Sequence, residues 1–356
     1  MRTQMLSIAA VLVVSMAVVG CPSNSPSATT ENPNEPAGKG PASRPAGKGP
    51  ANGPAGKAPS EKPADKVPTG KAPTGKTPSE PTTQPATVSA DGGAVMPTQA
   101  AIAARVKSAT ARLNASESGK LVLKAIEHHG GLQTWYSSGP IAFRFNYRPM
   151  GERKPVDSHQ VVDTWSSRAR HVWATDDKAE FGWNGKVAWV KDPNKSITTN
   201  PRFWSLTPYY FVGVPFVMAD PGVRLEMAGE QAFEGTTWAL VKVTFMAGTG
   251  DAPDDYYVLY IDKASGRIGG LRYIVTYRGF FKDGGHSPEK FMSYDGSQTV
   301  NGITLPKNYR TFAWNPDKKA VGEQVTAITL SDVSFKPDTQ ASYFEPIEGA
   351  EVLKGM

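Results

Sequence analysis

The chain contains a single cysteine, Cys21, and this limits the sulfur chemistry that the protein can perform. One cysteine forms neither an intramolecular disulfide nor a Cys-x-x-Cys metal site. The residue follows an apolar run from Met5 to Val19, which comes after a basic start at Met1-Arg2. This run is too short to cross a membrane comfortably and has the layout of a secretory signal, with an uncleaved anchor helix as the alternative. Cys21 therefore ends a targeting segment, and it is not expected to be a catalytic thiol.

Residues Val18-Val19-Gly20-Cys21 resemble a lipobox, the processing site of bacterial lipoproteins. The resemblance implies cleavage before Cys21 and acylation of its thiol and amine, so that residues 1–20 form a signal peptide. Residue 22 is proline and not aspartate, and among lipoproteins this implies that the retention signal for the inner membrane is absent. A lipid anchor in the outer membrane, facing the periplasm, is the expected location.

A second pattern, from Gly70 to Thr77, matches the phosphate-binding sequence GxxxxGK[ST] letter for letter. That sequence binds phosphate only where a buried strand precedes it and a helix begins at its end. Pro68 and Pro73 preclude a central strand here, and Pro78 biases Thr77 away from helix. We therefore expect no nucleotide site.

Histidines at three positions could act as ligands or bases. His128 and His129 fall in the last turn of a predicted helix, where a metal or base pair is one interpretation. Adjacent helical positions point about 100° apart, so we expect instead that both complement the negative end of the helix. His171 shares a strand face with Ala169 and Trp173, which is typical of an interior histidine whose polar atoms are satisfied.

Paired carboxylates occur at Asp176-Asp177 and Asp254-Asp255, both in expected turns, where such pairs are usually solvated or structural. The sequences HExxH and GxSxG and the Rossmann glycine pattern are absent. No catalytic residue, metal site or cofactor is therefore predicted, and we expect the protein not to be an enzyme. A hydrolase is kept as an alternative, because catalytic triads assemble from residues far apart in sequence.

The elements that could position functional groups lie in the C-terminal part of the chain. Sixteen of the 30 prolines fall between Pro22 and Pro97, whereas all 34 aromatic residues (8 Trp, 12 Tyr and 14 Phe) lie at or after Trp135. A segment without aromatics cannot bury enough apolar surface to offset its ordering entropy. Residues 21–98, with a Pro-Ala-Gly-Lys repeat, are predicted to be a disordered tether. Residues 99–356 remain as one folded domain.

The folded part begins with helices and continues with strands. Residues 100–113 favour a helix by propensity, and Ser116 or Ser118 can cap a second helix that ends at Gly130-Gly131. The hydrophobic period then becomes two, and Asn184-Gly185 is a strong hairpin signal. About ten or eleven strands joined by short turns predict a mostly β fold of the α+β class, with antiparallel pairing.

One long segment offers a candidate ligand site. Strand residues 256–261 are apolar on both faces, so both sides of the sheet must be covered. The uncharged, aromatic stretch from Phe203 to Ala219 is a candidate cover, either as packed core or as a lid over a cavity for an apolar ligand. For the lid hypothesis, the predicted ligand-binding residues are Trp204, Tyr210, Phe211, Phe216 and Met218.

Three segments resemble the lipoprotein-localisation (LolA/LolB-like) family, and together they cover most of residues 115–340. They are Gly130-Gly131 followed by Trp135 and the strand Ile141–Tyr147, the hairpin Tyr260–Arg267 around an Asp-x-x-x-Gly turn, and the edge element Val300–Pro306. The resemblance implies an incomplete antiparallel β-barrel or curved sheet, helices that form a lid over an apolar cavity, binding of acyl chains, and no catalysis. Arg144 is a candidate, by strand position alone, for the barrel arginine of the soluble carrier.

The expected function is that of a membrane-anchored envelope lipoprotein whose domain binds an acyl chain or an acylated protein. Expected partners are the membrane, through the N-terminal lipid, and an envelope protein or peptidoglycan. The near-balanced charge of the folded part argues against nucleic acid. The alternative is a protein-interaction or envelope-stress-sensing module, which a large exposed aromatic patch would support.

Overall fold

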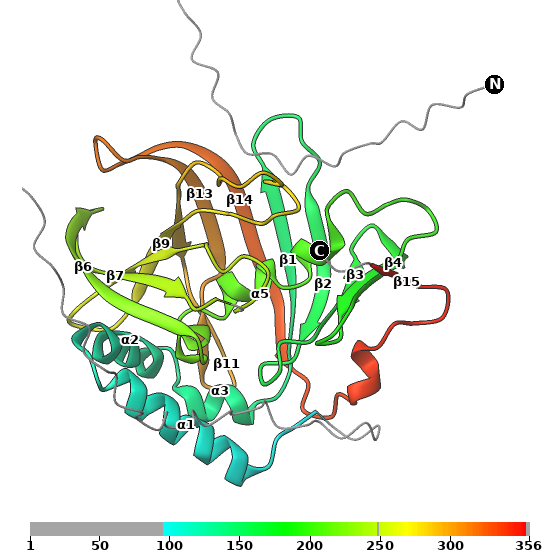
Figure 1. Ribbon diagram of the computed structural model, residues 1–356, viewed down its shortest axis with the longest axis horizontal. Coiled ribbons are helices and arrows are strands. Elements are labelled where there is room, and N and C mark those ends of the chain that lie inside the picture. Colours follow the sequence, from blue (N-terminus) through cyan, green and yellow to red (C-terminus); the bar gives the residue numbers. More distant parts are fainter. Residues whose placement is uncertain (1–94, 248, 354–356) are drawn as a thin grey trace, which may run out of the picture. The chain divides into compact units, whose positions relative to one another are not determined.

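The computed structural model describes residues 95–247 and 249–353 (Figure 1). The signal peptide 1–20, Cys21 and the tether up to residue 94 lie outside the described residues, and their assignments stay predictions. Val95 is buried, and its N–H donates a hydrogen bond to the carbonyl oxygen of Thr339 at 3.1 Å.

Three helices open the described part: α1 (Gln99–Leu113), α2 (Glu117–His128) and α3 (Leu132–Ser137). The Ser116 hydroxyl caps α2 by accepting a hydrogen bond from the Gly119 N–H at 3.0 Å. Ser118 instead donates to the carbonyl oxygen of Leu225, so Ser116 is the cap of the two candidates. Gly130-Gly131 ends α2 with positive φ angles, as expected. Within the described ranges, no helix has the length and apolar character needed to cross a membrane.

Thirteen of the described strands form one antiparallel sheet, ordered β15-β5-β4-β3-β2-β1-β14-β13-β10-β9-β8-β7-β6. Their bounds are β1 (Ile141–Pro149), β2 (Val156–Val162), β3 (Ala169–Trp173), β4 (Asp176–Trp183), β5 (Ala188–Lys191), β6 (Val223–Phe233), β7 (Thr236–Phe245), β8 (Tyr257–Ile261), β9 (Ile268–Tyr273), β10 (Lys290–Asp295), β13 (Asn308–Asn315), β14 (Ala320–Phe335) and β15 (Glu351–Leu353). β11 (Gln298–Val300) and β12 (Ile303–Leu305) form a separate hairpin. The curved sheet does not close, because β15 and β6 are its two edges (Figure 1).

The predicted fold class is confirmed: the described part is mostly β, with helices at its N-terminal end and an incomplete, curved antiparallel sheet. The strands in the described ranges outnumber the ten or eleven expected. β11, β12 and β15 have only three residues each, and three residues are too few to show an alternating pattern.

The sheet has a hydrophobic core on each face near β7 and β8. The outer-face core consists of Trp238, Leu240, Val258, Tyr260, Phe291 and Trp314. The hairpin of β6 and β7 helps to cover it, since the Phe233 ring packs on Phe291 at 4.7 Å. The Gln231 side-chain amide also donates to the carbonyl oxygen of Lys319 at 3.0 Å. The apolar pattern on both faces of residues 256–261 therefore reflects two separate cores.

The segment predicted to be a lid or core forms α4 (Pro201–Trp204), α5 (Thr207–Val212) and the 3₁₀ helix η1 (Phe216–Ala219). The Asn200 side-chain oxygen caps α4 by accepting from the Phe203 N–H at 3.0 Å. Most apolar side chains of the segment are buried in the main core, which also includes residues of α1, α2 and α3. The segment thus packs largely as core, and only part of it borders a cavity.

Candidate ligand-binding pocket

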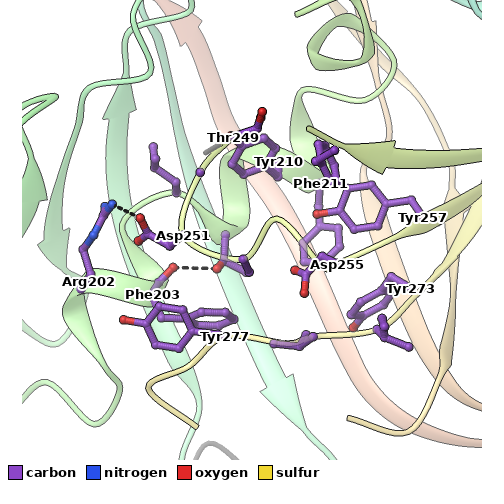
Figure 2. A pocket seen from close by; sticks show the side chains of 17 residues that line it. Arg202, Phe203, Tyr210, Phe211, Thr249, Asp251, Asp255, Tyr257, Tyr273 and Tyr277 are labelled. Atoms are coloured by element: carbon purple, nitrogen blue, oxygen red, sulfur yellow. Dashed lines mark hydrogen bonds and ion pairs between the residues drawn. The ribbon is translucent and has the colours of Figure 1, made fainter. Parts of the chain in front are cut away.

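A pocket of about 120 Å³ lies between α4 and α5 on one side and β8 and β9 on the other (Figure 2). The loop of residues 249–255, between β7 and β8, forms a third wall. The lining residues are Arg202, Phe203, Leu206, Thr207, Tyr210, Phe211, Phe245, Thr249, Gly250, Asp251, Ala252, Asp255, Tyr257, Tyr273, Ile274, Val275 and Tyr277. These residues come from four separate stretches of the chain, residues 202–211, Phe245, residues 249–257 and residues 273–277, so tertiary packing assembles the pocket.

Seven of the 17 lining residues are aromatic. On one side, the Phe211 ring lies 5.2 Å from that of Tyr273 and 6.5 Å from that of Tyr257. On the other, the Phe203 ring lies 5.0 Å from that of Tyr277. Burial raises the pKa of Tyr257 and of Tyr273 far above the ordinary value for tyrosine. Both phenols are therefore neutral at physiological pH, and these rings add no charge to the walls.

Asp255 is the polar group at the centre of the view in Figure 2. Its Oδ1 accepts hydrogen bonds from the backbone N–H and the hydroxyl of Thr276, at 2.6 and 2.7 Å. Burial nevertheless raises the pKa of the Asp255 carboxyl to about 6. Of the two carboxylates predicted to lie in a turn, Asp254 is exposed as expected, but Asp255 lines the pocket.

An ion pair joins α4 to the loop at the edge of the pocket. The Arg202 guanidinium lies 2.6 Å from a carboxylate oxygen of Asp251, and it also stacks over the Trp183 ring at 3.6 Å. Arg202 is thereby held by one partner on each side. The loop that covers the pocket is tied to α4 through this contact.

The structure separates the predicted ligand-binding residues into two groups. Tyr210 and Phe211 line the pocket, as Figure 2 shows. Trp204, Phe216 and Met218 are buried among core side chains and are not among the lining residues. The Phe216 ring, for example, stacks on that of Trp135 at 4.4 Å, with an angle of 5° between the planes.

Several lining residues were missed from the sequence. Tyr257, Tyr273, Tyr277 and Asp255 belong to β8, β9 and the loops beside them. The apolar pattern on both faces of residues 256–261 was the one available signal, but it does not tell which face borders a cavity. Arg144, the candidate barrel arginine, lies outside the pocket lining and pairs with Asp157 at 2.7 Å.

A buried Ser158–His171 pair lies elsewhere in the interior. His171 Nε2 donates to the Ser205 carbonyl oxygen at 2.9 Å, so its Nδ1 accepts from the Ser158 hydroxyl at 3.1 Å. Both side chains are fully buried, and burial lowers the pKa of His171 to about 4. His171 is thus an interior histidine with satisfied polar atoms, as predicted.

The adjacent histidines also have separate environments. His129 is buried, and its Nδ1 lies 2.8 Å from the Thr304 carbonyl oxygen. Burial lowers the pKa of His129 to about 4, so the ring is neutral at pH 7 and does not complement the helix end as a cation. This corrects the expectation for His129. No group of three potential metal ligands occurs in the part of the chain that the structure describes.

No family model matches this chain, and no curated protein matches it. Solved structures of similar fold include a LolA superfamily protein from Nitrosomonas europaea, with 11% identity over 62% of this chain and 93% of that one, and a TM-score of 0.41. A DUF1329 family protein from Desulfovibrio piger has 14% identity over 64% and 97%, with a TM-score of 0.44. The Mycobacterium tuberculosis lipoprotein LppX has 12% identity over 60% and 94%, with a TM-score of 0.21. These likenesses concern the fold alone.

Proposed function

We propose that the protein is a lipid-anchored lipoprotein of the cell envelope whose domain holds an apolar group in the pocket and does not transform it. The observation that carries this proposal is a pocket walled by aromatic rings, with no histidine, cysteine or serine among its lining residues. Such a site offers contact area and orientation to an apolar group.

The size of the pocket limits what it holds in this conformation. Small-molecule sites usually have about 300–1,000 Å³, and a cavity of roughly 150 Å³ holds benzene. A volume of about 120 Å³ therefore suits a group near the size of one aromatic ring or a short alkyl segment. A longer acyl chain fits only if the loop of residues 249–255 moves outward. Its ion pair to α4, from Asp251 to Arg202, is then expected to break.

Burial of apolar surface supplies the affinity. At about 0.8 kcal/mol for each buried CH₂, six carbons contribute roughly 5 kcal/mol before any cost. The loss of translational and rotational freedom opposes this by about 4–15 kcal/mol. Binding of a small group is therefore expected to be weak, and the aromatic contacts of the walls decide whether it is measurable.

Fluorescence titration of the full chain with N-phenyl-1-naphthylamine, a neutral apolar probe whose phenyl ring matches the pocket in size, tests the proposal. Val275 is a half-buried lining residue, and Val275→Trp fills the pocket, so this variant is expected to abolish the fluorescence increase. Tyr210→Ala removes part of a wall and is expected to weaken binding several-fold. Phe233→Ala is the matched control, because it truncates an aromatic ring that packs on the outer-face core.

The proposal is wrong if the wild-type chain binds no probe, or if Val275→Trp binds it as well as the wild type does. Equal loss in Phe233→Ala and Tyr210→Ala would also contradict it, because probe binding would then follow general stability and not the pocket.

Anchoring is the second part of the proposal. An acylated Cys21 would attach the chain to a membrane. Residue 22 is proline and not aspartate, the retention signal for the inner membrane in lipoproteins, and this favours the outer membrane. The sequence between Cys21 and the folded domain would act as a tether, so that the pocket works at a distance from its membrane.

A further inference from the structure

We infer that the pocket takes a cationic amine group attached to an apolar body, such as a quaternary or primary ammonium on an alkyl chain. The inference rests on the proposed function, since it concerns the same pocket, and it adds the chemical class of the ligand. Three features carry it: an uncompensated carboxylate, walls of aromatic rings, and a volume that suits a compact head group.

The carboxylate of Asp255 has no cation beside it. No lysine, arginine or histidine of the described residues forms an ion pair with it. Among the lining residues of the pocket, Arg202 is the one with a positive charge. Arg202 is already occupied by Asp251 and by the Trp183 ring. Two hydrogen bonds from Thr276 serve only Oδ1 of Asp255. Its second oxygen has no hydrogen-bond partner in the described structure and is left for a ligand.

The aromatic walls favour the same charge. The face of an aromatic ring carries partial negative charge, and a cation within about 6 Å of a ring centroid is attracted to it. Phe211, Tyr257 and Tyr273 come from α5, β8 and β9 and lie around Asp255 in Figure 2. An ammonium group that enters beside Asp255 would meet both the carboxylate and several ring faces. Water that is displaced from apolar walls adds to the gain.

An anionic head group is disfavoured in the same position. With Asp255 ionised, the lining carries Arg202, Asp251 and Asp255, so two negative charges face one positive charge. A free fatty-acid carboxylate placed beside Asp255 would be repelled by it. A fatty acid would therefore bind with its carboxylate outside the pocket or not at all, whereas an alkylammonium would place its head inside.

The charge of Asp255 sets the pH dependence of binding. Burial raises its pKa to about 6, so the carboxyl is largely neutral at pH 5 and ionised at pH 7.5. Groups that face it from the surrounding elements are Asp254 on its own loop, Asp251 and Arg202 at the edge, Tyr210 on α5, Tyr257 on β8, Tyr273 on β9 and Tyr277 beyond β9. The pKa of each of these tyrosines is raised, so they stay neutral in this range. Affinity for a permanent cation should therefore rise with pH through the titration of Asp255.

Displacement of bound N-phenyl-1-naphthylamine from the full chain tests the inference. Hexyltrimethylammonium, hexanol and hexanoate have the same chain with a cationic, a neutral and an anionic head. At pH 7.5 the cation is expected to displace the probe at a concentration at least tenfold lower than hexanol, and hexanoate is expected to be the weakest. Affinity for the cation should fall several-fold at pH 5.

Two variants locate the effect. Asp255→Asn keeps the oxygen that accepts from Thr276, removes the charge, and should bring the cation and hexanol to similar affinities with no change between pH 5 and 7.5. Asp254→Asn is the matched control, since this neighbouring carboxylate is exposed and lies outside the pocket lining. It should keep the preference for the cation.

Equal affinity of the wild type for the cation and hexanol would overturn the inference and leave the proposed function standing. An unchanged preference in Asp255→Asn would overturn it as well. Failure of the probe to bind the wild type would remove the proposed function and this inference together.

Discussion

Replacement of Phe216 by alanine decides between a role in the core and a role in the cavity wall. The Phe216 ring is fully buried and stacks on Trp135, whose ring also lies 6.4 Å from that of Tyr209 and 6.2 Å from that of Phe335. The truncation therefore opens a hole inside a packed cluster of rings. Phe→Ala changes at such sites cost about 3–5 kcal/mol of unfolding free energy.

The expected loss is readily measured by thermal unfolding. For a domain of about this size, each kcal/mol lowers the Tm by roughly 2–4 °C, so Phe216→Ala should melt about 6–20 °C below the wild type. At a temperature where the variant is still folded, its affinity for N-phenyl-1-naphthylamine should remain close to that of the wild type. Circular dichroism melts and fluorescence titrations on the same samples give both quantities.

Tyr210→Ala supplies the opposite profile, because Tyr210 is half-buried and lines the pocket. It should lose probe affinity with a smaller drop in Tm. Phe216→Leu fills part of the hole and should recover much of the lost stability. A Phe216→Ala variant with a Tm within about 2 °C of the wild type, combined with lost probe binding, would refute the reasoning and place Phe216 in the cavity wall.

Two further predictions concern acid stability and processing. Burial lowers the pKa of His171 in the folded state to about 4. The neutral, buried ring therefore makes its full contribution to the free energy of unfolding above about pH 6.5, and this stability is lost as the pH falls toward 4, by about 3 kcal/mol in all. Urea unfolding at pH 7.5 and 4.5 should show a smaller loss for His171→Gln than for the wild type, and equal losses would contradict the assignment. Cys21→Ser should leave the precursor uncleaved before residue 21, and mass spectrometry that finds a free thiol on the mature wild-type chain would refute lipidation.

The sequence alone determined where helices begin and end and which segments form strands, because these features depend on residues close together in the chain. Ser116 caps α2 and Gly130-Gly131 ends it, because capping oxygens and positive φ angles act within a few residues. Alternation of apolar side chains predicted the strands, since each strand shows its two faces in its own sequence, and the short turns between strands predicted antiparallel pairing. His171 was also predictable as interior, because its strand neighbours share its face.

The pocket was decided by tertiary structure. The aromatic stretch from Phe203 to Ala219 marked the right region, but its composition is the same whether a ring enters the core or borders a cavity. Helix α5 turns Tyr210 and Phe211 toward β8 and β9, while Phe216 meets Trp135. Asp255 looked like a turn residue, and only the packing of the loop against these strands half-buries it beside aromatic rings. Which of two apolar faces meets a cavity depends on where α4, α5 and the loop of residues 249–255 pack against β8 and β9, and these segments are far apart in the chain.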